Sequence, residues 1–179
     1  MDAIKKFTAL RVPDFWLTAR PCAEALVAVA TVTLVVSYLA DTAPFLSSVF
    51  ARKVLATFGR TLLIPALAEE LLWRVGAFYA VGCCCKEITL WSPQSIIINL
   101  CYSGYHHLLA DWVAENFRIS GAPIVFRAPA FLAITFFLGL GCTHAYMETG
   151  RNPCAPVIVH AAAVTFWLTC LGGEEALRP

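Results

Sequence analysis

Apolar runs recur along the chain at lengths that suit membrane-spanning helices. A spanning α-helix needs about 20 mostly apolar residues. Five such runs lie at residues 22–40, 61–84, 94–110, 130–146 and 156–171. A bilayer imposes helical structure on a spanning segment outside a closed barrel, even on the Val- and Thr-rich first run. The pattern therefore predicts an all-α, polytopic transmembrane bundle of about four to six membrane helices.

More polar segments separate these runs. Residues 1–21 carry four cations and two acids, and the apolar run after them is too long for a secretory signal and lacks a cleavage pattern. We predict an amphipathic surface arm there, followed by a single transmembrane domain over 22–171 and a tail over 172–179. Residues 43–58 are amphipathic and predict a surface or short re-entrant helix, whereas residues 111–127 predict a polar connector.

The amino-acid composition supports the membrane assignment and argues against one class of binding partner. Of the 179 residues, 59% are hydrophobic and 14% charged, with a mean hydropathy of +0.71. A soluble domain is about half apolar and about one quarter charged. The net charge of +1, without a basic tract, argues against nucleic acid as a partner and leaves membrane lipids as the expected environment. The predicted location is an organellar inner membrane or the endoplasmic reticulum.

Eight cysteines are present, but none forms a C-x-x-C pair, so the spacing typical of zinc and thioredoxin-like sites is missing. Most lie in or beside apolar runs, where Cys acts as a small hydrophobe. We predict reduced, packing cysteines; they are Cys22, Cys83, Cys84, Cys85, Cys101, Cys142, Cys154 and Cys170.

Three charged residues interrupt the second apolar run: Glu69, Glu70 and Arg74. A charge at the centre of a membrane helix costs about 2.5–3.5 kcal/mol and by default marks a functional site. Glu70 and Arg74 are four residues apart, so they share a helix face and can form an ion pair. Glu69 points about 100° away, has no partner on its own helix and must either face another polar group or become protonated. Pro65, one turn earlier, either kinks this helix or lies near its first turn, where proline is tolerated.

Histidines on later runs are the expected partners of Glu69. His106 lies on the third run and His160 on the last. A carboxylate and two imidazoles from separate helices form either a base with its proton-transfer partners or a metal site. We interpret His107–Asp111 and His144–Glu148 as pairs at the membrane interface, because each pair is one turn apart.

These residues form motifs that resemble the CAAX-protease and bacteriocin-processing family. The motifs are Glu-Glu-x-x-x-Arg at residues 69–74, an aromatic residue four positions before a histidine at Tyr102 and His106, and a late histidine at His160. The resemblance covers about residues 60–167. The resemblance implies a helical membrane fold and a peptidase activity.

The resemblance also implies roles. Glu69 is the expected general base that activates water, His106 assists it, and His160 helps to stabilise the oxyanion. Glu70, Arg74 and Tyr102 are expected to shape the site. No cofactor is expected, although a metal held by Glu69, His106 and His160 is a low-probability alternative.

The predicted function is that of an intramembrane endopeptidase with a peptide substrate. Val164 stands where the family usually has Asn, a change that removes a hydrogen-bond donor. The alternative is therefore a catalytically degenerate member that serves as an accessory subunit of a multi-subunit membrane complex, for instance a mitochondrial one. A third, weaker alternative is a quinone- or metal-binding subunit.

Overall fold

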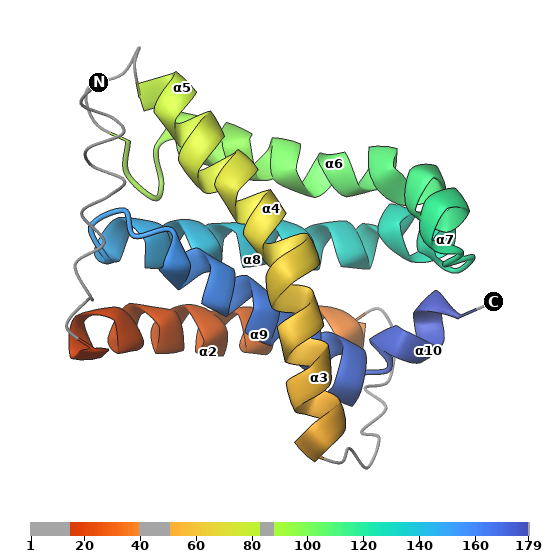
Figure 1. Ribbon diagram of the computed structural model, residues 1–179. Helices are drawn as coiled ribbons and strands as arrows, with labels where there is room; N and C mark the ends of the chain where they lie inside the picture. The colour runs from red at the N-terminus through yellow and green to blue at the C-terminus, as the bar shows by residue number, and fades with distance from the viewer. Residues whose placement is uncertain (1–14, 40–50, 83–87, 179) are drawn as a thin grey trace.

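A computed structural model describes residues 15–39, 51–82 and 88–178, which form helices and turns without a strand. The fold is the predicted all-α membrane bundle (Figure 1). The elements are α2 (Phe15–Leu39), α3 (Ala51–Thr61), η1 (Leu62–Ala66), α4 (Leu67–Glu70), η2 (Leu71–Ala77), α5 (Phe78–Gly82), α6 (Pro93–Phe117), α7 (Ala122–Arg127), α8 (Pro129–Glu148), α9 (Cys154–Cys170) and α10 (Gly173–Leu177).

The apolar helices α2, α8 and α9 pack around one core. Helix α8 contacts α2 on one side and α6 on the other, and α9 contacts both α2 and α8 (Figure 1). Small residues allow this close approach, as is usual between membrane helices. A Cβ added at Gly141 on α8 would lie 2.8 Å from Val29 Cγ2 on α2. The core residues shared by these helices are Cys22, Ala25, Val29, Leu138, Cys142, Ala145, Ala155 and Val159.

Two of the described helices are long and apolar enough to cross a bilayer. They are α2, over Thr18–Val35, and α8, over Pro129–Glu148. Helix α9 is also apolar but has 17 residues. The other two predicted spans correspond to α6 and to the continuous helical segment from residue 51 to residue 82, which carries Glu69 and Glu70.

That continuous segment, residues 51–82, is called the rod below. It crosses in front of the other helices in Figure 1 and alternates between α-helical and π-helical turns. Pro65 lies inside the π-helical turn η1. Proline lacks an N–H and its ring clashes with the carbonyl four residues earlier, and a wider π-helical turn accommodates both effects. The predicted surface helix at residues 43–58 is not separate, because its described part, α3, continues into the rod.

Several helix ends have identifiable causes. The side chain of Ser92 accepts a hydrogen bond from the Ser95 N–H (3.3 Å), and Pro93 occupies the first turn of α6. Helix α6 continues to Phe117, so residues 111–127 are not the predicted polar connector but the end of α6, a turn and the short helix α7. At the end of α9, Gly172 adopts φ 76°, the left-handed conformation that ends helices.

The last residues form α10, which packs against α9 and α7. The N–H of Gly121 donates a hydrogen bond to the Leu177 carbonyl (3.3 Å). Glu174 pairs with Lys53 Nζ on α3 (2.6 Å). The segment predicted as a tail therefore connects the start of the rod with the turn before α7.

Two predicted interface pairs are wrong, because each side chain meets a residue from another helix. Asp111 pairs with Arg127 (2.6 Å), and His144 faces Glu24 (3.4 Å). The five cysteines in the described part of the chain are free, as predicted: Cys22, Cys101, Cys142, Cys154 and Cys170. Cys83, Cys84 and Cys85 lie outside the described residues, as do residues 1–14 of the predicted arm.

Candidate functional site

A buried ion pair lies in the middle of the rod. Glu70 Oε2 lies 3.1 Å from Arg74 Nε, and both side chains are fully buried. This is the pair that the spacing of four residues predicts. The contact falls outside good hydrogen-bond geometry, so these two atoms are held together by charge. Burying either charge alone would be costly, so each residue requires the other.

Helices α6 and α8 complete the surroundings of Arg74. The guanidinium carbon lies 4.7 Å from the centroid of the Tyr102 ring, at a distance typical of a cation–π contact. Arg74 Nη2 donates a hydrogen bond to the Gly139 carbonyl (2.9 Å). A Cβ at Gly139 would lie 2.5 Å from Asn99 Oδ1 and 2.9 Å from Tyr102 Cδ1. Glycine at this position therefore lets α8 approach α6 and the rod.

A polar network between α6 and α8 lies beside this pair. Asn99 Nδ2 donates to the Ser95 carbonyl (2.9 Å) and to Thr143 Oγ1 (3.1 Å). Asn99, Ser95 and Thr143 are fully buried. No short motif marks these three residues in the sequence, although an Asn in an apolar run needs hydrogen-bond partners and is a signal of such a network.

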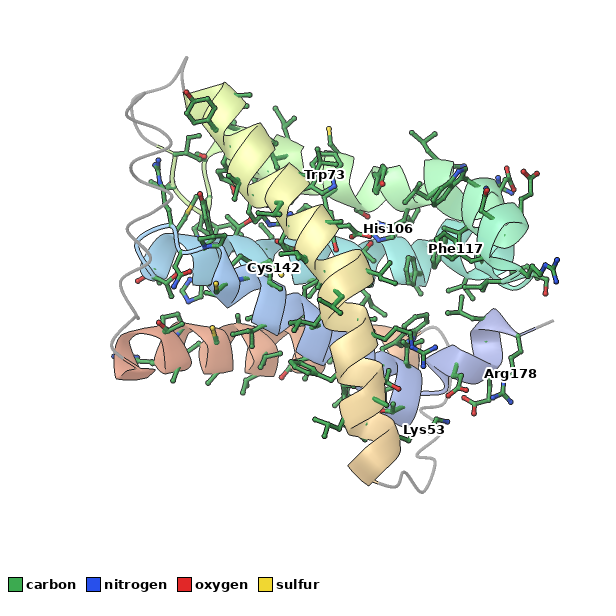
Figure 2. The ribbon with its side chains drawn as sticks, viewed as in Figure 1. Lys53, Trp73, His106, Phe117, Cys142 and Arg178 are labelled. Carbon is green, nitrogen blue, oxygen red and sulfur yellow. The ribbon has the colours of Figure 1, made fainter. Side chains whose placement is uncertain are left out.

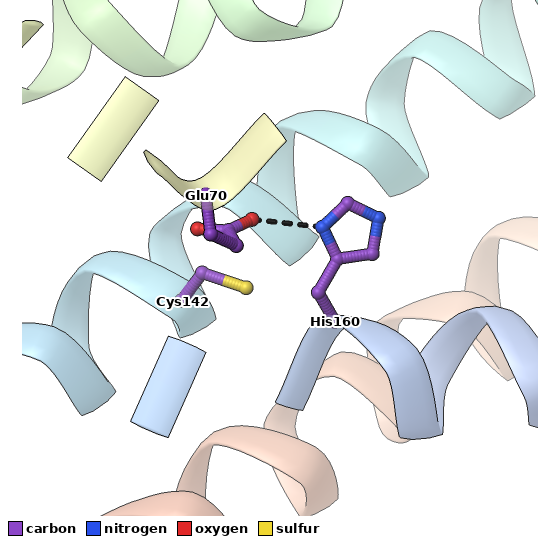
Figure 3. A group of neighbouring side chains, drawn as sticks. All are labelled: Glu70, Cys142 and His160. Carbon is purple, nitrogen blue, oxygen red and sulfur yellow. Dashed lines mark hydrogen bonds and ion pairs between the residues drawn. The ribbon is translucent and has the colours of Figure 1, made fainter. Parts of the chain in front are cut away.

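His160 is bound by Glu70 rather than by Glu69. Its Nδ1 lies 2.8 Å from Glu70 Oε1, as the dashed line in Figure 3 marks. Cys142 lies beside this contact, and its Sγ–H donates to the Pro156 carbonyl (3.6 Å). Glu70 thus connects Arg74 on its own rod with His160 on α9.

Glu69 faces both histidines. Its Oε2 lies 3.8 Å from His106 Nε2 and 3.9 Å from His160 Nε2. The Glu69 side chain is 15% exposed, against 10% for His106 and 3% for His160. The structure therefore brings together the acid and the two imidazoles named from the sequence, from the rod, α6 and α9.

The hydrogen bond made by Nδ1 of each imidazole determines whether Nε2, the atom that faces Glu69, is a donor or an acceptor. His106 Nδ1 lies 3.1 Å from the Tyr102 carbonyl, which only accepts hydrogen bonds, so Nδ1 carries the proton. His160 Nδ1 donates to Glu70 in the same way. In the neutral imidazoles both Nε2 atoms are then acceptors that point at a third acceptor, Glu69 Oε2. Such a cluster requires a donor between its members, either a water molecule or a shared proton.

Further buried polar atoms near this cluster have no hydrogen-bond partner among the described residues. Glu69 Oε2, Trp73 Nε1, Arg74 Nη1 and the Tyr102 hydroxyl belong to this group. Buried polar groups are nearly always satisfied by protein, water or ligand. Their concentration here distinguishes the site from the apolar core between α2 and α8.

The potential metal ligands have a different grouping from the one considered in the sequence analysis. Glu70, Cys142 and His160 bring ligand atoms within 4.8 Å of one another. However, the Glu70 carboxylate already binds the Arg74 cation and the His160 N–H, and the thiol donates to a carbonyl. A divalent cation there would lie beside a guanidinium, so this set does not fit a metal.

Two grooves on the described surface lie elsewhere. One, of about 640 Å³, is lined by apolar residues of α3 and α9, from Val54 to Cys170. The other, of about 320 Å³, lies between residues 88–90 and the end of α8, which includes His144. Neither groove includes Glu69, His106 or His160.

Comparison with known proteins gives the family of the chain. The family model described as Type II CAAX prenyl endopeptidase Rce1-like matches residues 51–166, more than half of the chain. The chain belongs to this family. The resemblance predicted from the motifs is therefore confirmed, and this is a family of membrane-embedded proteins. No curated protein and no solved structure matches the chain.

The matched region of this Rce1-like chain includes Glu69, His106, His160 and Val164. Val164 is partly buried and packs against the apolar core between α2 and α8. Trp167, one turn later, packs against Phe131 with ring centroids 5.7 Å apart. Position 164 therefore contributes apolar packing and offers no side-chain donor to the site.

Proposed function

We propose that this chain is a membrane-embedded endopeptidase that uses Glu69 to activate water against a peptide bond of prenylated CAAX substrates. The family description supports this substrate class, and the arrangement of the site supports this chemistry. The observation that carries the proposal is the convergence of His106 Nε2 and His160 Nε2, 3.8 and 3.9 Å away, on Glu69 Oε2.

The first step is binding and activation of water. A water molecule at this point can donate one hydrogen to Glu69 Oε2 and the other to His106 Nε2, which lie 3.8 Å apart and make no direct hydrogen bond. Glu69 takes a proton from this water, and the water oxygen attacks the carbonyl carbon of the substrate. A positioned general base contributes about 10²- to 10⁴-fold to the rate.

The second step is collapse of the tetrahedral intermediate. The carbonyl oxygen becomes an oxyanion, and the proton held by Glu69 passes to the leaving amine as the C–N bond breaks. His160 donates a hydrogen bond to the oxyanion through Nε2 where it enters the reaction already protonated on both ring nitrogens, because Nδ1 is committed to Glu70. The Glu70 carboxylate balances that positive charge, while Arg74 holds Glu70 in place.

The test is hydrolysis of a prenylated CAAX peptide by the purified full chain in lipid bicelles. We expect release of the C-terminal fragment by the wild type and a loss of about 10²-fold or more for Glu69→Gln, which keeps side-chain volume but not basicity. Glu148→Gln is the matched control, because Glu148 is exposed at the end of α8. Equal turnover by wild type and Glu69→Gln would reject the assigned base.

A chelator distinguishes the metal alternative. Glu69, His106 and His160 are suitable donor types for zinc, and the proposal assigns them to water instead. We expect that 1,10-phenanthroline leaves hydrolysis unchanged. Loss of activity that added zinc restores would favour a metal held by these three residues.

One observation favours a second candidate function. Val164 packs into the apolar core, where it provides no oxyanion donor, and such a donor is worth about 10²- to 10³-fold in rate. The second candidate is therefore an inactive family member that acts as an accessory subunit of a membrane complex, for instance an organellar one. No hydrolysis by the wild type, together with co-purification of a defined partner, would favour it.

A further inference from the structure

An apolar wall of three aromatic rings borders His106 on the side of α7, α8 and α9. The rings of Phe126 and Phe131 lie 5.8 and 5.6 Å from the His106 ring, measured between centroids. They stack on each other at 5.0 Å with planes 15° apart. The wall continues to Trp167, 5.7 Å from Phe131. The aromatic wall below means Phe126, Phe131 and Trp167.

The wall lies on the more open side of the site. Phe126, Phe131 and Trp167 are each partly exposed, and Ile124, on the same short helix as Phe126, is 79% exposed. By contrast, Arg74 and the neighbouring residues of the polar network are fully buried. Figure 2 shows His106 on the α7 side of the rod, away from Cys142. A substrate that reaches Glu69 from this side passes the wall.

The side chains of the aromatic wall are suited to contact with a hydrocarbon chain. Phe126 and Phe131 present rings without polar atoms beside the reacting groups, whereas Trp73 and Tyr102 carry unpartnered donors. The three rings come from three helices and form a connected series, with successive centroids 5.0 and 5.7 Å apart. Aromatic faces bind hydrocarbon chains through apolar burial, which contributes about 25 cal/mol per Å².

From this geometry we infer that Phe126 and Phe131 contact the isoprenoid chain of the substrate and set the preference for a prenylated over an unprenylated peptide. The inference rests on the proposed function and adds residues that determine its specificity. These residues touch the substrate beside the scissile bond and take no part in proton transfer.

The experiment compares a farnesylated CAAX peptide with the same peptide carrying an S-methyl group. The measured quantity is the ratio of the two kcat/KM values in lipid bicelles. We expect Phe126→Ala and Phe131→Ala each to lower this ratio about tenfold, which corresponds to about 1.4 kcal/mol. Phe137→Ala is the matched control, because Phe137 lies on α8 and is 40% exposed beside Phe136. It should leave the ratio within about twofold, a margin set by ordinary surface substitutions.

The outcomes separate the two proposals. A wild type that cleaves neither peptide overturns the proposed function and this inference together. A wild type that cleaves, with an unchanged ratio in both wall variants or an equal fall in Phe137→Ala, overturns the inference alone. A role of the rings in packing alone would lower both kcat/KM values equally. If the alanine variants unfold, Phe126→Leu and Phe131→Leu are used instead, because leucine retains most of the apolar volume. A fall in the ratio of the two kcat/KM values in these variants supports the inference, and an unchanged ratio overturns it.

Discussion

Glu69 and Glu70 are neighbours in the chain, yet their carboxylates lie in different surroundings. Glu70 is fully buried, pairs with Arg74 and accepts the N–H of His160. Glu69 remains 15% exposed and faces two imidazole nitrogens at 3.8 and 3.9 Å without a direct hydrogen bond to either. Consecutive helical residues point about 100° apart, so adjacent positions of one rod reach two different environments.

The comparison teaches that the charge of a membrane carboxylate does not by itself mark it as reactive. Glu70 and Arg74 form a connection between the rod, α8 and α9, because Arg74 also donates to the Gly139 carbonyl (2.9 Å). The Glu70 carboxylate is already engaged by the ion pair with Arg74 and by the His160 N–H, whereas Glu69 Oε2 has no direct hydrogen-bond partner among the described residues. We therefore assign positioning to Glu70 and proton transfer to Glu69.

The largest effect on stability is expected when the Glu70 pair is broken. Arg74→Leu leaves a buried carboxylate without its cation, and we expect the free energy of unfolding to fall by about 3–5 kcal/mol. Titration with sodium dodecyl sulfate in mixed micelles, followed by circular dichroism, measures this change. Glu69→Gln is the control and should shift stability by less than about 0.5 kcal/mol. Equal losses in the two variants would contradict the division of roles.

A double variant sharpens the same result. Glu70→Leu with Arg74→Leu removes both charges, so the loss should be smaller than for Arg74→Leu alone, because no uncompensated charge stays buried. Activity should still fall in the double variant, since His160 loses its acceptor. A double variant less stable than Arg74→Leu would mean that the ion pair is not the stabilising feature.

The next largest effect on stability concerns the close approach of α8 to α6 at Gly139, whose carbonyl accepts a hydrogen bond from Arg74. Gly139→Ala places a Cβ 2.5 Å from Asn99 Oδ1 and 2.9 Å from the Tyr102 ring. We expect a loss of about 1–3 kcal/mol, as for other overpacked cores. Gly104→Ala on α6 is the control, because its Cβ would meet nothing within 4 Å. That variant should stabilise the chain by up to about 1 kcal/mol through helix propensity; a similar loss in both would contradict the steric explanation.

The smallest effect concerns an exposed ion pair outside the bundle. Hydrogen bonds from Lys53 and then Arg178 lower the pKa of Glu174 below its usual value of 4.5. This contribution is therefore fully present above pH 4.5 and is lost as the pH falls through the lowered pKa. Because the pair is exposed, it should be worth less than about 1 kcal/mol. Thermal unfolding of wild type and Glu174→Gln should differ at pH 7 and converge as the pH falls below the lowered pKa of Glu174; a constant difference would exclude this ion pair as the cause.

Much of the site could be predicted from the spacing of residues along a helix and from the free-energy cost of placing a charge in an apolar run. The interval of four residues between Glu70 and Arg74 predicts their pairing on any helix. The expense of an unpaired charge in an apolar run left Glu69 with a polar partner from another helix or with protonation, and the few histidines on the later runs favoured the partner. Proline in the second run predicted a disturbed helix, and the structure has a π-helical turn around Pro65.

Partners across helices were harder to predict. The spacing of one turn made His144 and Glu148 look like a pair, but His144 faces Glu24, 120 residues earlier. In the same way Asp111 pairs with Arg127 rather than with His107. Local spacing shows which side chains share a face, but only the packing of helices shows which of them meet.

By itself, the sequence determined the helical membrane class, the Glu70–Arg74 pair and the need of Glu69 for a distant partner, because each follows from the helical repeat and from the cost of polar groups in lipid. The tertiary structure alone decided that Glu70 binds His160, that Gly139 seats Arg74 and that Phe126 covers His106. These contacts join residues far apart in the chain. They depend on how α6, α7, α8 and α9 pack against the rod, which no short sequence window records.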